Sequence, residues 1–136
     1  MARQTKARTQ EYRLLITPSV SEGTRKPTTR FVLETTQSFA AFRYELTVEE
    51  RIEPHALILR ILGLKTPPLN LPSAGRARFV REYEHLNGTY QVTVVGLDGG
   101  ENTCTVKISP EKVEILKSPT GSSLTVAANS THWTHE

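Results

Sequence analysis

The four histidines of this chain are the side chains best suited to bind a metal ion or to transfer a proton near neutral pH. They are His55, His85, His132 and His135. The last two form the sequence His-Trp-Thr-His, a spacing that could hold a metal ion from one helical turn. They stand among the last residues, with no other histidine or cysteine close to them. We therefore expect an uninvolved tail there and predict no metal site.

The single cysteine, Cys104, is a nucleophile only if a neighbouring group such as histidine lowers the pKa of its thiol. It alternates with Val106 and Ile108, so we expect it on the inward face of a strand. A cysteine in that position is usually a small core hydrophobe. With one cysteine the chain also has no internal disulfide.

Two acidic clusters could supply the paired carboxylates of acid–base catalysis. The Glu49–Glu53 cluster falls in a predicted connection between strands, and we interpret it as solvated. Glu82 and Glu84 point the same way on a predicted strand beside Arg81, as in an exposed row of charges. The sequence has no phosphate-binding glycine loop, nucleophile elbow or HExxH motif. We expect no catalytic residue, no cofactor and a protein that is not an enzyme.

Two groups of residues are candidates for binding. Arg76, Arg78 and Arg81 are interleaved with the aromatic residues Phe79 and Tyr83, a composition that could hold single-stranded nucleic acid by charge and stacking. The pattern typical of RNA-binding sheets is absent, so this remains an alternative.

The second group lies in the most hydrophobic stretch, residues 56–64. Leu57, Leu59 and Ile61 fall on one side of a predicted strand; the other side carries Ile58, Arg60 and Leu62. A strand that is apolar on both sides is either central in a sheet or covered by a tail or a partner, and a buried helix is the alternative. An exposed apolar surface here would indicate protein–protein association.

Charge is concentrated at the beginning of the 136-residue chain. Residues 1–30 carry seven of the 17 Lys and Arg but only two of the 14 Asp and Glu, so the net charge of +3 comes from this segment. We expect residues 1–10 to be a disordered basic leader. A leader of this kind can bind nucleic acid through counterion release. No apolar run is long enough to span a membrane and no signal-peptide core is present, so we expect a cytoplasmic protein.

The elements that must position these residues are predicted to be strands. Ser38–Val48 alternates with period two, and Thr89–Ser109 has the pattern of a hairpin around Asp98-Gly-Gly. Arg76–Leu86 fits either a strand or a helix, and we favour the strand. Lys112–Lys117 and Ser123–Ala127 could add further strands.

The segment from Leu86 to Gly100, LNGTYQVTVVGLDGG, resembles the penultimate strand of fibronectin type III and related immunoglobulin-like domains. That resemblance implies a two-sheet sandwich in which the hydroxyl of Tyr90 bonds back to upstream backbone. The tryptophan that this family carries in an early core strand is missing, because the only tryptophan is Trp133.

We therefore expect an all-β protein: an antiparallel, immunoglobulin-like β-sandwich of about seven to nine strands over residues 11–127, followed by a loose tail over 128–136. The function expected is a non-enzymatic interaction module that binds a protein partner or associates with itself. A β-barrel carrier of a small ligand is the first alternative, and it predicts an interior pocket of a few hundred cubic ångströms, on the order of 300–1,000 Å³. Nucleic-acid binding through the basic leader is the second.

Overall fold

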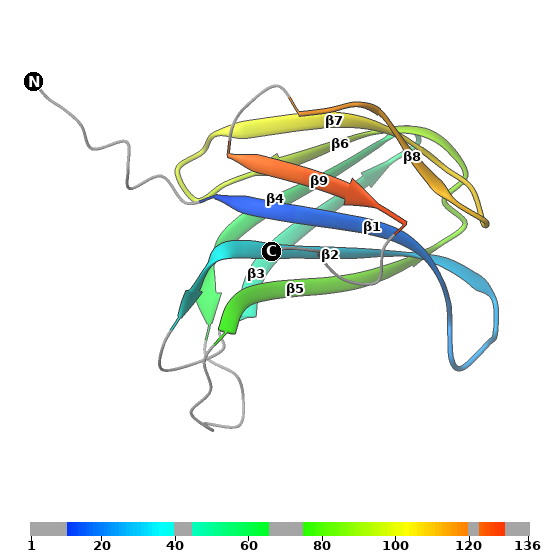
Figure 1. Cartoon of the computed structure of the whole chain (residues 1–136), viewed down its shortest axis with the longest axis horizontal. Helices are drawn as coiled ribbons and strands as arrows, with labels where there is room; N and C mark the ends of the chain where they lie inside the picture. Colours follow the sequence, from blue (N-terminus) through cyan, green and yellow to red (C-terminus); the bar gives the residue numbers. More distant parts are fainter. Residues whose placement is uncertain (1–10, 40–44, 66–74, 120–122, 130–136) are drawn as a thin grey trace, which may run out of the picture.

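The computed structural model describes residues 11–39, 45–65, 75–119 and 123–129, and in these ranges the chain forms nine strands and no helix (Figure 1). The strands are β1 (Tyr12–Val20), β2 (Pro27–Phe39), β3 (Glu45–Glu53), β4 (Ala56–Lys65), β5 (Gly75–Glu84), β6 (Gly88–Val95), β7 (Glu101–Ile108), β8 (Val113–Lys117) and β9 (Leu124–Ala128). The all-β prediction and the predicted number of strands are confirmed.

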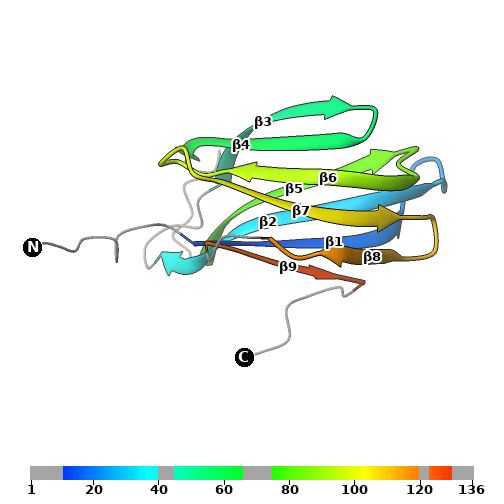
Figure 2. The same cartoon turned by 90° about the horizontal axis from the view of Figure 1, so that it is seen from above.

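All nine strands belong to one sheet, in the order β8-β7-β6-β4-β3-β5-β2-β1-β9. The sheet curls until its two edge strands, β8 and β9, come into contact, so that the body resembles a nearly closed barrel (Figure 2). This differs from the antiparallel two-sheet sandwich that we expected. Three neighbouring pairs, β1–β9, β4–β6 and β3–β5, are parallel. The immunoglobulin-like arrangement is therefore not confirmed.

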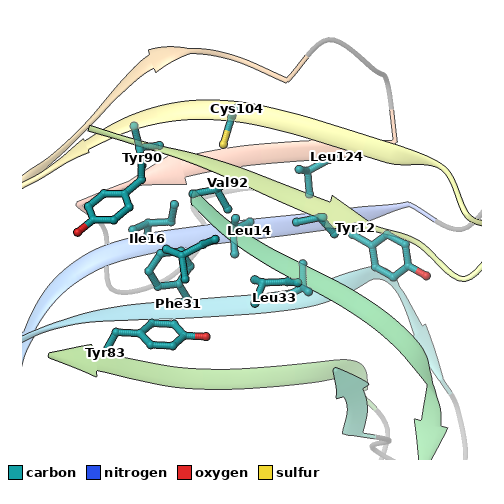
Figure 3. Close-up of a cluster of buried hydrophobic side chains, with 14 of the residues drawn as sticks. Tyr12, Leu14, Ile16, Phe31, Leu33, Tyr83, Tyr90, Val92, Cys104 and Leu124 are labelled. Atoms are coloured by element: carbon teal, nitrogen blue, oxygen red, sulfur yellow. The ribbon is translucent and has the colours of Figure 1, made fainter. Parts of the chain in front are cut away.

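The core follows from the alternation of apolar residues along each strand, because side chains of a strand point alternately to its two faces. Phe31 and Leu33 of β2 are two residues apart and both are fully buried, so they share the inward face of the strand. On β4 the buried side chains are Leu57, Leu59 and Ile61, and Ile58 is only partly buried. The barrel interior is thus a packed layer of apolar side chains contributed by strands from both halves of the sheet (Figure 3).

Most predicted strands are confirmed, with one clear error of extent. Thr89–Ser109 contains the antiparallel hairpin β6–β7, and Arg76–Leu86 is largely occupied by β5, not by a helix. The two late segments form β8 and β9. Ser38–Val48 is not one strand, because β2 ends at Phe39 and β3 begins at Glu45. Residues 40–44 of that segment lie outside the described residues.

Asn129 joins the two edges of the sheet. Its backbone N–H donates to the Ile16 carbonyl at 3.0 Å, and its φ is 65°, in the left-handed region that asparagine tolerates. Its side-chain amide then acts like a strand partner for Val113: Oδ1 accepts from the Val113 N–H at 2.7 Å, and Nδ2 donates to the Val113 carbonyl at 2.5 Å. One side chain therefore satisfies both backbone groups of Val113 at the gap between β8 and β9. The expected tail boundary at residue 128 falls inside β9, and residues 130–136 and 1–10 lie outside the description.

Among the residues described, no helix is long and apolar enough to cross a membrane.

Candidate binding site between strands β3 and β5

Strands β3 and β5 are neighbours in the sheet, yet they pair at a single position, Glu45 with Arg78. Other neighbouring strands pair over four to nine residues, as β2 and β5 do. Beyond Glu45 the strand β3 continues to Glu53, and its opposite edge is bonded throughout to β4. In the part of the chain described, the edge of β3 that faces β5 therefore has no backbone partner from Leu46 to Glu53. We call this opening the β3–β5 gap.

The side chain of Glu50 spans the β3–β5 gap. Glu50 lies opposite Leu59 in the β3–β4 register, so it is on the inward face of β3. Its Oε1 accepts a hydrogen bond of 2.6 Å from the Tyr83 hydroxyl and one of 3.0 Å from Arg81 Nε, both on β5. The Arg81 guanidinium also lies 5.6 Å from the centre of the Tyr83 ring. Polar side-chain contacts thus replace the missing backbone ladder.

The ring of Tyr83 packs against the hydrophobic core. It meets Phe31 edge to face, with 5.3 Å between ring centres and an interplanar angle of 87° (Figure 3). This is a favourable geometry for an aromatic pair. The ring is buried while its hydroxyl reaches Glu50, so Tyr83 connects the hydrophobic interior to the gap.

The Tyr83 contact predicts a dependence of stability on alkaline pH. Burial, followed by the hydrogen bond to Glu50, raises the pKa of the Tyr83 phenol above its usual value of 10.0. A group whose pKa is higher in the folded state stabilises the fold fully below its unfolded pKa, and this contribution is lost as pH rises past 10.0. Urea unfolding should therefore show a smaller alkaline loss of stability for Tyr83→Phe than for the unmodified protein. An equal loss in both proteins would show that Tyr83 is not responsible.

A cleft of about 210 Å³ adjoins Glu50 on the outer face of the β3–β4 hairpin, with Glu49, Arg51, Ile58 and Arg60 as its other lining residues. Arg60 and Glu49 face one another at 3.7 Å, with both side chains more than half exposed. An exposed pair at this distance contributes little to stability. Both charges are therefore available to a partner at small cost to the fold.

Exposed apolar side chains are frequent around the same hairpin. Leu62 is 55% exposed and Ile52 is 53% exposed, while Val80 on β5 is 45% exposed. Leu62 is the extra residue of a bulge, because Thr47 pairs with Gly63 and Val48 with Ile61. A bulge re-aims the side chain that it carries. The structure thus brings the predicted residues Ile58, Arg60 and Leu62 together on one hairpin.

The predicted arginine cluster is not one surface. Arg78 lies on the outer face of β5 and its Nη2 is 3.1 Å from Glu34, whereas Arg81 lies on the other face and meets Glu50. The side chain of Arg76 lies outside the description, although its backbone is part of β5. Odd and even positions of a strand point to opposite faces, which separates Arg81 from Arg78. The arginines and aromatic residues predicted to hold single-stranded nucleic acid are therefore divided between two faces of β5. Nucleic-acid binding through the basic leader stays a prediction, because residues 1–10 lie outside the described residues.

The remaining candidate residues have structural surroundings. Cys104 is buried, and burial raises the pKa of its thiol to about 11, so it is protonated at neutral pH. Tyr90 accepts a hydrogen bond of 3.2 Å from the backbone N–H of Asn87, an upstream contact of the kind the family resemblance implied. His132 and His135 lie outside the description. No group of three or more metal-binding side chains occurs among the residues described.

The sequence analysis predicted that Glu50 is solvated, and this prediction was wrong, because its carboxylate is bonded to Tyr83 and Arg81. The signal was present in the alternation of Leu46, Val48 and Glu50, which places a carboxylate at an inward position. A charged residue on an inward face requires a partner. That partner comes from β5, about thirty residues later, and the sequence alone does not identify it.

The chain was compared with protein-family models, with curated proteins and with solved structures, and none of these comparisons found a significant match.

Proposed function

We propose that this protein is a non-enzymatic binding module that takes an extended segment of a partner protein into the β3–β5 gap. The observation that carries this proposal is the edge of β3 from Leu46 to Glu53, which lacks a backbone partner in the described residues although it lies inside the sheet order. An exposed edge offers a row of N–H and C=O groups, and adding a strand to such an edge is a common mode of peptide recognition.

The side chains around the gap fit this mode. Backbone hydrogen bonds would supply affinity. Contacts to every second side chain of the added strand would supply sequence specificity. Ile52, Leu62 and Val80 offer apolar contacts, and Glu49, Arg51 and Arg60 offer charged ones. Charged residues along an edge also discourage indiscriminate pairing. We therefore expect a partner strand that combines apolar residues with charges of both signs.

The test is a selection of linear peptides on the full chain, followed by affinity measurements on two proline variants. Arg51→Pro and Ile52→Pro alter adjacent residues, whose N–H groups point to opposite edges of β3. The variant whose N–H group points to β4 loses a backbone hydrogen bond and therefore stability. The variant whose N–H group points into the gap loses only a donor there. We expect this gap-facing variant to lose peptide binding while keeping its unfolding midpoint.

The matched control is Leu116→Pro on β8, an exposed position remote from the gap in the sheet order. It should bind the selected peptides like the unmodified protein. If the peptides bind all variants equally, or if no peptide is selected, the proposal is wrong.

The carrier alternative has less support. The described clefts border exposed residues, while the inward faces are filled by core side chains, so no observation favours a carrier. The immunoglobulin-like relationship remains an expectation based on residues 86–100, and the module proposed here does not depend on it.

A further inference from the structure

The barrel closes at a seam between its two edge strands, β8 and β9, which are in contact (Figure 2). In the part of the chain that the structure describes, no backbone hydrogen bond joins these two strands. The Asn129 side chain takes the place of such bonds, because it binds the N–H of Val113 at 2.7 Å and the carbonyl of Val113 at 2.5 Å. One side chain therefore supplies the described hydrogen bonds across the seam.

Strand β9 covers an edge of β1. The five residues of β9 pair in parallel with the first five residues of β1. The covered part of β1 contains Leu14, Leu15 and Ile16, which are buried and uncharged. If this edge were open, its unpaired N–H and C=O groups would be a template for pairing with another chain, and no charge in these three residues would oppose it. Strand β9 therefore protects β1 from pairing with other molecules.

Strand β9 itself is held by few contacts. Its backbone is paired along one edge only, the edge that faces β1. Among its five side chains only that of Leu124 is buried. The N–H of Asn129 donates to the carbonyl of Ile16, and alternate residues of a strand direct their N–H groups to the same edge, so those of Thr125 and Ala127 also face β1. A segment with so few buried apolar contacts opens at a lower free energy than the core does.

From these contacts we propose that the Asn129 side chain is a latch that keeps β9 on its own β1, and that release of the latch lets the molecule exchange β9 with a second copy of this chain. The second copy is the occupant that fits the uncovered edge, because an identical β9 makes the same parallel pairs with β1. Exchange of an identical element requires no new interface and is a low-cost route to a dimer. This inference is independent of peptide binding in the β3–β5 gap.

The first test asks whether β9 opens separately from the core. Native-state hydrogen exchange of the unmodified protein should be faster at Thr125 and Ala127 than at Val92 and Val106, whose hairpin has neighbours on both sides in the sheet. Low urea concentrations should hardly change the rates at the two β9 amides, because detaching one short strand exposes little surface. The same urea dependence at all four amides would overturn the proposal, because β9 would then open only with the whole fold.

The second test releases the latch. Asn129→Gly removes the side chain and keeps the left-handed backbone, because glycine adopts a φ of 65° without steric cost. Light scattering should show that this variant forms a dimer whose fraction rises with protein concentration, in a range where the unmodified protein is a monomer. Asn87→Gly, which alters an exposed asparagine of the β5–β6 turn, is the matched control and should stay monomeric.

A third measurement identifies the occupant of the β1 edge. A synthetic peptide of residues 123–129 should compete for this edge and convert the Asn129→Gly dimer into monomers. Adding Ala127→Pro to Asn129→Gly removes an N–H group that faces β1, so the double variant should not form the dimer. An Asn129→Gly variant that stays monomeric at every concentration would contradict the proposal. A dimer that survives both the peptide and the added proline would contradict it as well, because β9 would then not be the exchanged strand.

Discussion

Replacing Glu34 with alanine is expected to lower the free energy of unfolding by about 3 kcal/mol, because it leaves two arginines without their carboxylate. Glu34 lies on the outer face of β2, yet its side chain is only 2% exposed. The register places it between Arg13 of β1 and Arg78 of β5. Oε1 accepts from Arg13 Nη2 at 2.8 Å and from Arg13 Nε at 3.1 Å, and Oε2 is 3.1 Å from Arg78 Nη2.

The expected cost lies at the lower end of the range for a broken buried pair, because the Arg78 side chain is 56% exposed and can recover water. Arg13 is more enclosed, so it carries most of the penalty. Glu34→Gln keeps an acceptor for Arg13, so its free energy of unfolding should lie between that of the unmodified protein and that of Glu34→Ala. Equilibrium unfolding in urea, read as a change of midpoint at constant slope, measures these differences.

Glu82→Ala is the matched control for Glu34. Glu82 faces Arg30 at 3.6 Å, in the same pair of strands, and both side chains are substantially exposed. An exposed pair is worth about 0–1 kcal/mol, and the hydrogen bond of 3.2 Å that Glu82 accepts from the Thr28 hydroxyl adds about 1 kcal/mol, so this variant should cost less than Glu34→Ala. Equal losses for Glu34→Ala and Glu82→Ala would show that burial of Glu34 does not matter.

Phe31→Ala should cost about 3–5 kcal/mol, the range for truncating a fully buried aromatic side chain. Phe31 has no exposed surface and is the largest completely buried side chain among the residues that the structure describes. Its ring also supports Tyr83 by the edge-to-face contact, so the variant loses both buried area and that pairing. The wall of the β3–β5 gap should loosen at the same time.

Two measurements check the Phe31 prediction. Thermal or urea unfolding gives the stability, and hydrogen exchange of the Tyr83 amide reports whether the wall of the gap has loosened. Val80→Ala, on an exposed position of β5, should stay within about 0.5 kcal/mol of the unmodified protein. A Phe31→Ala variant as stable as Val80→Ala would mean that Phe31 is not a central core residue.

Local pattern was sufficient to predict much of the secondary structure. The alternation of Tyr90, Val92 and Val94, with glycines after Asp98, predicted the β6–β7 hairpin because both strands and their turn are adjacent in the chain. The choice of a strand for Arg76–Leu86 was also correct, since Ala77 and Tyr83 are both buried on one face. Ile58, Arg60 and Leu62 lie on β4, which pairs with β3, and their role in binding stays a prediction.

A period of two is a local property, so the pattern of residues alone specifies the β-strand class, most strand positions and the face of most apolar residues. The pairing of strands that are distant in the chain is specified only in the folded protein. It makes β4 a parallel neighbour of β6, brings Glu50 to Tyr83 and encloses Glu34 between two arginines. It also decides that Arg78 meets Glu34 and Arg81 meets Glu50, and that the side chain of Asn129 joins the edges of the sheet. Each of these contacts depends on register between distant segments, which no local pattern specifies.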